Sequence, residues 1–308
     1  MTGTPSTTSA IGVDIGGTKL AVAAVDDSGA LVTPVSTRPT PAAAGPAAIV
    51  ATLQSMVEEV ARAASLPGSV PVGVGSAGVL APGGRVLSAT DAIAGWAGFE
   101  LRAELEAALG RSVRALNDVH AAALGELRFG AARGVRSFLM ATVGTGLGGA
   151  LVLDGRLRTG RTGTAGSLGH IAASGRPPAR CTCGQTGHLE AYVSGPALEA
   201  AYRARSGVAR SLRDLGALRE EDPVAAEVIR DGAETLGRGL ADALNLVDVE
   251  CVVVGGGVAE LGAPYLDIVA RAMHDGALPG PSSAPLIRAR LGTRATLVGA
   301  AAHALDPD

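Results

Sequence analysis

The chain has 308 residues, 47% of them hydrophobic and 2% aromatic, and a formal net charge of −3. This length suits one large domain or two ordinary ones, and the small charge gives no electrostatic reason to expect nucleic acid or an anionic membrane as a partner. Three cysteines argue against a secreted disulfide framework, and the sequence shows neither a secretory signal nor an uncharged run of membrane-spanning length. We therefore expect a cytoplasmic protein.

The first part of the chain predicts an α/β arrangement after a mobile tail at residues 1–9. The apolar run at 11–15 ends in the glycine turn GGTK, and LAVAAVD and ALVTPV continue it as a meander of strands. A helix with an apolar stripe is expected over 49–64, and a second helix over 99–109 should stop at Gly110. The later strands of this part are expected over 70–75 and 112–118.

The opening pattern recurs about 130 residues further on. The strand SFLMATV (137–143) is followed by the glycine turn GTGLGG and the returning strand ALVLDG, as IGVDI is followed by GGTK and LAVAAVD. The repetition predicts two related lobes, each starting with a hairpin whose turn faces a common cleft. The remaining elements are expected to be a helix over 224–247, a strand over 251–257 and a final helix.

Three glycine turns, in DIGGTK, GTGLGG and VVVGGG, each follow an apolar run. None has the spacing of a P-loop, and none has the G-x-G-x-x-G of a Rossmann unit. Each one alone is typical of an ordinary turn. Together, with Asp14 before the first and Thr145 inside the second, they predict backbone cradles for a Mg²⁺–nucleotide complex.

Asp118 follows Asn117 where a strand ends and a helix begins. An aspartate at this place is a common helix N-cap. A carboxylate is also what phosphoryl transfer to an alcohol needs, because it accepts the hydroxyl proton. The spacing leaves both roles open.

The motifs together resemble the ROK family of sugar kinases and sugar-responsive repressors, from Ile11 to the final helix. The resemblance implies an actin-like (ribonuclease H-like) α/β fold with two lobes, and a homodimer. The repressors carry a winged helix-turn-helix, for which about ten residues before the first strand are too few. The lobes would be 10–118, joined by a final helix at about 295–308, and 119–294, with a zinc-binding loop at 170–188. The motifs in chain order are DIGGTK (14–19), GVGSAGVL (73–80), GWAGFEL (95–101), NDVHAAALGE (117–126), GTGLGG (144–149), AGSLGH (165–170), CTCGQTGHLE (181–190) and VVVGGGV (252–258).

By this resemblance the chain binds ATP, Mg²⁺ and a sugar. Asp118 is the general base, and Asp14 helps to hold Mg²⁺. The groups implied for the ATP phosphates are Gly16, Gly17, Thr18, Lys19, Thr145 and Gly146, those for adenosine are Gly255, Gly256 and Gly257, and those for the sugar are Gly78, Asn117, Ser167, His170 and Glu190.

Three positions depart from the family pattern, two of them in ways that matter for the site. Ser167 stands where the kinases usually have a glutamate that accepts hydrogen bonds from the sugar near its anomeric end. Loss of such a charged hydrogen bond costs about 1.5–3 kcal/mol. His188 stands where the zinc motif usually has a third cysteine, and, in a smaller departure, Ala77 replaces a common proline.

Cys181 and Cys183 form a Cys-x-Cys pair, which is an unusual spacing for structural zinc. A redox pair is more often Cys-x-x-Cys, and a disulfide across one residue is strained. With His170 and His188 the cysteines supply a closed Cys₂His₂ set for structural Zn²⁺. The alternatives are that His188 is a solvated loop residue and that Glu190 lies on a helix surface.

The leading hypothesis is an ATP-dependent, glucokinase-like hexose kinase that acts on the 6-hydroxyl of glucose. Because of Ser167, fructose, mannose or an N-acetylated hexosamine is an alternative substrate. A non-catalytic sugar sensor is a hypothesis from another class, against which Asp14, Asp118 and the glycine turns all argue.

Overall fold

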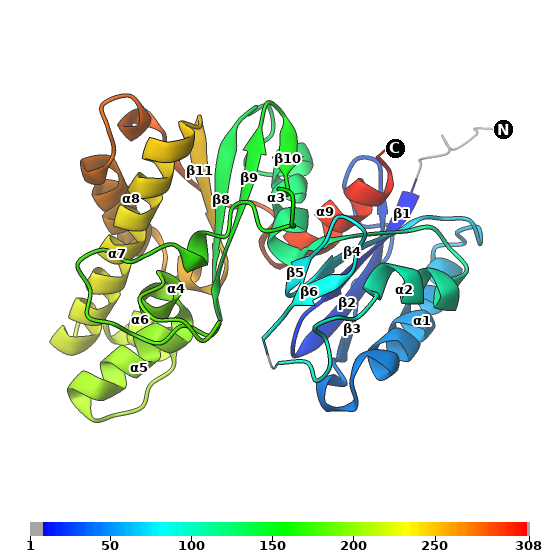
Figure 1. Ribbon diagram of the computed structural model, residues 1–308, viewed down its shortest axis with the longest axis horizontal. Coiled ribbons are helices and arrows are strands. Elements are labelled where there is room, and N and C mark those ends of the chain that lie inside the picture. The colour runs from blue at the N-terminus through cyan, green and yellow to red at the C-terminus, as the bar shows by residue number, and fades with distance from the viewer. Residues whose placement is uncertain (1–8, 91, 307–308) are drawn as a thin grey trace. The chain divides into compact units, whose positions relative to one another are not determined.

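The computed structural model describes residues 9–90 and 92–306, and this part of the chain forms two compact α/β units (Figure 1). Unit 1 contains the chain through Gly134, the segment Thr159–Ala165 and the chain from Thr293, and unit 2 contains Val135–Arg158 and Gly166–Gly292. The predicted tail at 1–9 lies outside the described residues except for Ser9, which begins the first strand. No helix in the described ranges is long and apolar enough to cross a membrane.

The sheet of unit 1 has the strand order β3-β2-β1-β4-β7. Its first three strands are antiparallel, and β1, β4 and β7 are parallel. The third strand begins six residues later than the predicted start of ALVTPV, of which only Leu31 forms an isolated bridge, to Val25. The strands are β1 (Ser9–Ile15), β2 (Lys19–Asp26), β3 (Ser36–Pro39), β4 (Val72–Ser76) and β7 (Val113–Asn117), and β5 (Val79–Leu80) pairs with β6 (Val86–Ser88) as a separate hairpin.

The sheet of unit 2 repeats this plan with the order β10-β9-β8-β11-β12. Again the first three strands are antiparallel, and the last three are parallel. The repeated hairpin read from the sequence is therefore present in both units. The strands are β8 (Phe138–Val143), β9 (Leu147–Leu153), β10 (Arg156–Arg158), β11 (Cys251–Gly255) and β12 (Leu286–Arg288).

The helices of unit 1 form where the sequence has apolar stripes. The stripe of α1 is buried, and α2 ends at Gly110, whose φ of 62° is the left-handed conformation that glycine adopts without cost. The helices are α1 (Pro46–Ala63), α2 (Leu101–Leu109), α3 (Asp118–Phe129) and α9 (Ala295–Ala304), with 3₁₀ turns η1 (Ala42–Ala44) and η5 (Gly292–Arg294) beside α1 and α9.

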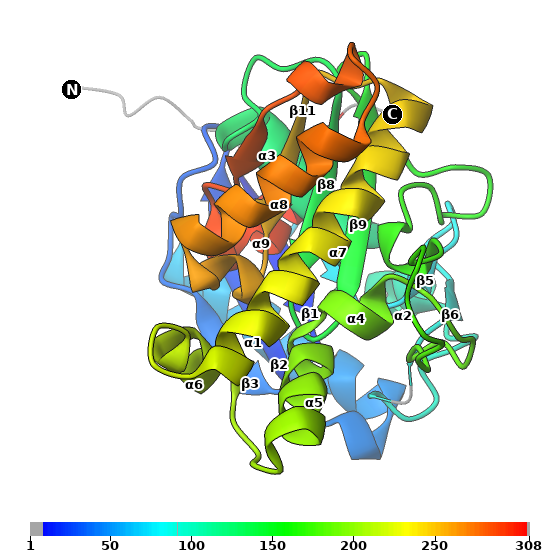
Figure 2. The same ribbon diagram turned by 90° about the vertical axis from the view of Figure 1, so that its left-hand side faces the viewer.

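The long helix α7 of unit 2 packs side by side with α8 (Figure 2). A Cβ on Gly237 of α7 would lie 2.5 Å from the carbonyl oxygen of Val269 in α8, so glycine permits this close packing. The helices are α4 (Glu190–Val193), α5 (Gly195–Ser206), α6 (Leu212–Leu218), α7 (Pro223–Val247) and α8 (Ala263–Gly276), and the 3₁₀ turns are η2 (Leu168–His170), η3 (Gly257–Leu261) and η4 (Pro281–Ser283).

The final helix α9 packs against β1 and β4 of the unit 1 sheet and against α3. A Cβ on Gly73 of β4 would lie 1.8 Å from the carbonyl oxygen of Ala300, and a Cβ on Gly299 would lie 1.7 Å from that of Ala121 in α3. Both contacts require glycine because any larger residue would overlap backbone atoms. This packing keeps α3 in unit 1, so the boundary follows Gly134, whereas the sequence placed it after Asp118.

Candidate active site and metal centre

The hairpin turn between β1 and β2 is held by its own backbone and by Thr40. Gly16 N–H donates to the carbonyl oxygen of Lys19 over 3.0 Å. The Thr40 hydroxyl donates to the Gly16 carbonyl over 2.7 Å, and Thr40 N–H donates to that of Thr18 over 3.0 Å. Thr18 and Lys19 remain exposed, Gly16 and Gly17 are partly exposed, and the turn is therefore ordered and open to a ligand. Nothing in the sequence pattern indicated Thr40.

Asp14 and Asp118 have pKa values close to neutrality. Burial and repulsion by Asp118 raise the pKa of Asp14 to about 7, against the opposing attraction of Lys19. Burial raises the pKa of Asp118 to about 6, although hydrogen bonds from Val119 N–H and from Asn117 act to lower it. A carboxyl with a pKa near the working pH is suited to accept a proton, and a carboxylate next to another one attracts a divalent cation.

Asn117, the residue before Asp118, is the N-cap of α3. The Asn117 Oδ1 accepts from Val119 N–H over 3.0 Å and from His120 N–H over 3.2 Å. Its Nδ2 donates to the carbonyl oxygen of Gly78 over 2.9 Å. Asp118 is the first helical residue, and its Oδ1 also accepts from Val119 N–H over 2.8 Å, but the capping residue is Asn117. The predicted sugar-binding residues Gly78 and Asn117 thus lie together beside Asp118.

The glycine turns of unit 2 meet at one edge of its sheet, because β8 and β11 are parallel neighbours. A Cβ on Gly256, whose φ is 88°, would lie 2.3 Å from the carbonyl oxygen of Val143, so the two turns are in contact. Thr145 is exposed between Gly144 and Gly146, whose backbones share a hydrogen bond of 2.8 Å. The structure therefore brings Thr145 and Gly146 close to Gly255–Gly257, as expected for groups that hold one nucleotide.

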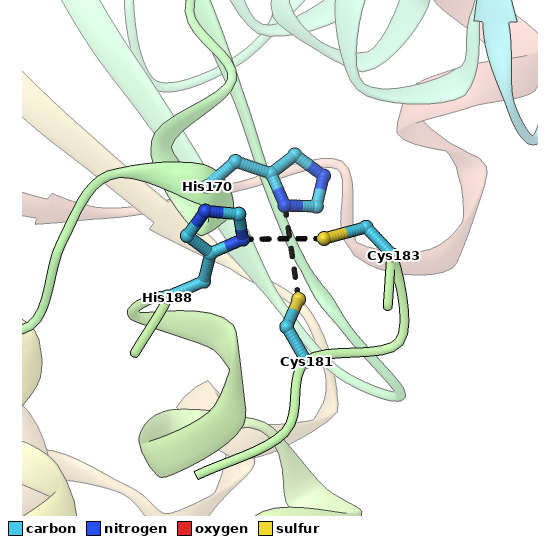
Figure 3. A group of neighbouring side chains, drawn as sticks. All are labelled: His170, Cys181, Cys183 and His188. Carbon is cyan, nitrogen blue, oxygen red and sulfur yellow. Dashed lines mark hydrogen bonds between the residues drawn. The ribbon is translucent and has the colours of Figure 1, made fainter. Parts of the chain in front are cut away.

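His170, Cys181, Cys183 and His188 point toward one another (Figure 3). Among the described residues they form a cluster whose ligand atoms all lie within 4.8 Å of one another. Cys181 Sγ is 3.8 Å from His170 Nδ1, and Cys183 Sγ is 3.2 Å from His188 Nδ1. In tetrahedral zinc sites, bond lengths of about 2.0–2.3 Å place ligand atoms roughly 3.3–3.8 Å apart. The donor set fits Zn²⁺, the two pairs lie close to this spacing, and His188 is directed into the cluster.

The loop between His170 and Cys181 is also held by protein contacts that the sequence did not indicate. Arg176 donates from Nε to Thr235 Oγ1 over 2.9 Å and from Nη2 to the carbonyl oxygen of Asp231 over 2.8 Å. The Tyr192 hydroxyl donates to the Pro177 carbonyl over 2.6 Å and accepts from Ala179 N–H over 3.0 Å. These hydrogen bonds help to order the loop, which contains glycine and proline residues, in addition to any metal that binds there.

Glu190 is buried, with 7% of its surface exposed, so it does not lie on a helix surface. Its Oε2 accepts from Leu147 N–H over 2.9 Å, and its Oε1 accepts from the Thr182 hydroxyl over 2.5 Å. Ser167 is partly exposed directly before η2 and lines a cavity of about 430 Å³ together with Leu168.

A family model described as the ROK family matches residues 10–306 of the chain. The chain belongs to the ROK family. It is 36% identical to a glucokinase of Streptomyces coelicolor, over 97% of this chain and 98% of that protein. It is 35% identical to an N-acetylmannosamine kinase of Salmonella typhimurium, over 94% of this chain and 96% of that one.

The solved structure of a ROK family glucokinase from Streptomyces griseus, in complex with glucose and AMPPNP, matches this ROK chain with a TM-score of 0.83. The two are 33% identical, and the match covers 96% of this chain and 99% of the other. The likeness confirms the predicted actin-like, ribonuclease H-like α/β fold. Together these relatives place the chain among the sugar kinases of the ROK family.

In this ROK chain the predicted site residues fall into one group in each unit. Unit 1 brings Asp14, Asn117, Asp118 and Gly78 near the turn that ends at Lys19. Unit 2 joins the cysteine–histidine cluster to Glu190, and joins Glu190 to the turn at Leu147. The motifs predicted the members of each group. The residues whose hydrogen bonds hold these groups in place were not predicted: Thr40, Arg176, Thr182 and Tyr192.

Proposed function

We propose that this chain is an ATP-dependent hexose kinase whose substrate is glucose and whose site of phosphorylation is the 6-hydroxyl. The observation that carries the proposal is Asp118, a carboxyl with a pKa of about 6 that stands at the first position of α3, directly after the capping residue Asn117. Similarity to a glucokinase and to a glucose-bound kinase structure supports glucose as the first substrate to test.

In the proposed reaction, Asp118 accepts the proton of the sugar hydroxyl as the oxygen attacks the γ-phosphorus of ATP. The bond from phosphorus to the oxygen that bridges to ADP breaks, and ADP leaves with that electron pair. Mg²⁺, when bound, neutralises the charge on the phosphates, and Asp14 is the carboxylate that we assign to it. The turn at Gly16–Lys19 and the turn at Thr145–Gly146 present backbone N–H groups for phosphate oxygens, and Gly255–Gly257 lie beside the second turn for adenosine.

Asp118→Asn tests this role directly, because the amide keeps the size of the side chain but accepts no proton. We expect turnover with glucose to fall by about 100-fold or more, with the fold unchanged. Asp27→Asn is the matched control, since Asp27 is an exposed carboxylate of the same unit. Full turnover by Asp118→Asn in a coupled assay for ADP would refute the mechanism.

A second substrate class is favoured by Ser167 together with the similarity to an N-acetylmannosamine kinase. A serine is shorter than the usual glutamate and neutral, so it makes no charged hydrogen bond near the anomeric end of the sugar. In a glucose site, Ser167→Glu should raise kcat/KM for glucose by about tenfold or more, because hydrogen bonds to charged groups contribute about 1.5–3 kcal/mol. An unchanged or lower value, with turnover of fructose, mannose or an N-acetylated hexosamine, would assign the other substrate.

We also propose that His170, Cys181, Cys183 and His188 hold a structural Zn²⁺. A closed set of four protein ligands leaves no coordination position for a reactive water. The role of the metal would then be to fix His170 and Glu190 for contact with the sugar. Metal analysis of the purified protein tests the assignment, and His188→Ala should reduce the bound zinc, whereas His274→Ala, a histidine of α8, should not. For the assembly we infer a homodimer in the cytoplasm, which sedimentation tests for the subunit number.

A further inference from the structure

The short helix α4 is attached to the phosphate turn of unit 2 at both of its ends. At its first residue, Glu190 accepts from Leu147 N–H over 2.9 Å. Just after its last residue, Gly195 N–H donates to the carbonyl oxygen of Gly144 over 2.8 Å. The turn from Gly144 to Leu147 is therefore held by one segment that continues directly from the cysteine–histidine loop.

The second oxygen of Glu190 is held by that loop. Its Oε1 accepts from the hydroxyl of Thr182, the residue between Cys181 and Cys183, over 2.5 Å, and from Cys181 Sγ over the longer distance of 3.4 Å. The carboxylate is thus bonded through one oxygen to the Cys-x-Cys segment and through the other to the phosphate turn. A carboxylate fixed at both oxygens has little freedom to rotate, so a displacement of Thr182 is transmitted to Leu147.

The turn also lies in close contact with Glu190. A Cβ on Gly146 would lie 2.5 Å from Glu190 Oε2, so the carboxylate occupies the space that a side chain there would need. Glu190 is buried, which excludes water as a substitute for the bond from Leu147 and makes its loss costly. The contacts connect the predicted metal site to the predicted ATP site within one unit.

We propose that Glu190 is a positioning residue that couples the Cys-x-Cys loop to the phosphate turn, with the Thr182 hydroxyl as the donor that orients it. This inference rests on the proposed function only in assigning the turn to ATP. It adds a role for Thr182 and a second role for Glu190, besides any contact with the sugar. The order of the loop then sets the affinity for the nucleotide.

The test compares Thr182→Val, which keeps the shape of threonine without the hydroxyl, with Thr182→Ser, which keeps the hydroxyl. In Thr182→Val we expect the amide of Leu147 to exchange about tenfold faster with deuterium, because a charged hydrogen bond that orients its acceptor is lost. We expect the dissociation constant of AMPPNP, measured by calorimetry, to rise by about 3- to 10-fold, and bound metal to stay unchanged. Thr182→Ser should behave as the native protein in all three measurements.

Unchanged exchange at Leu147 or unchanged AMPPNP affinity in Thr182→Val would overturn the inference. Loss of metal in Thr182→Val alone would also overturn it, because the effect would then arise from the metal. Failure of the proposed function has a different signature, since the native protein would then turn over no hexose while the exchange at Leu147 still responded to Thr182→Val.

Discussion

Asn117 offers a test of the site that separates stability from catalysis. Its Oδ1 caps α3 by accepting from Val119 and His120, and its Nδ2 donates to the carbonyl of Gly78. Loss of an N-cap costs about 1 kcal/mol, and loss of the hydrogen bond to Gly78 costs about 1 kcal/mol more. Asn117→Ala should therefore lower the free energy of unfolding by about 2 kcal/mol. Asn117→Ser, which retains a capping oxygen, should lower it by about half as much.

Urea denaturation of the native protein and both variants measures these differences as shifts of the midpoint at constant slope. Activity gives the second readout. If Asn117 also binds the sugar, both variants should raise KM for glucose by a similar factor, although they differ in stability. A free energy of unfolding for Asn117→Ala within about 0.5 kcal/mol of the native value would refute the reasoning, because the cap and the Gly78 bond would then contribute nothing.

Three further predictions concern Gly299, His120 and Asp118 of unit 1. Gly299→Ala should destabilise the protein by about 1–3 kcal/mol in thermal unfolding, although alanine favours helices, because its Cβ would overlap the backbone of Ala121, whereas Gly68→Ala at an open position should not. Burial lowers the pKa of His120 below its ordinary value of 6.5, so at acid pH the unfolded state binds more protons than the folded state. Stability should therefore fall as pH falls below about 6.5. In His120→Asn the Tm should fall less steeply with falling pH, and a slope equal to that of the native protein would count against this role of His120. The raised pKa values of Asp14 and Asp118 have the opposite effect, because they make the folded state more stable as pH falls. The comparison is therefore between the Tm of His120→Asn and the Tm of the native protein at each pH. Because the pKa of Asp118 is about 6, kcat/KM should decline as pH falls through about 6 as the base is protonated, and a flat acid limb down to pH 5 would contradict its role.

Several features of this chain follow from short stretches of sequence. Apolar runs that end in glycine turns specified both hairpins, and the stripe from Ile49 to Val60 specified α1 and its buried face. Gly110 specified the end of α2 through its left-handed φ. The order of the motifs identified the family and predicted which residues form the site. In each case the information lies within one element, where backbone preference and burial pattern are set by neighbouring residues.

The tertiary structure decided which of these residues touch. Asn117 rather than Asp118 caps α3, the boundary of unit 1 lies after α3, and the last helix joins β4 through Gly73. Glu190 reaches Leu147, 43 residues earlier in the chain, and Arg176 reaches Thr235, 59 residues later. Such partners are chosen by the packing of whole helices and sheets, in which hydrogen bonds must be satisfied wherever groups are buried. Local sequence patterns carry no record of that distant choice, so the residues that hold the site in place emerged only from the folded chain.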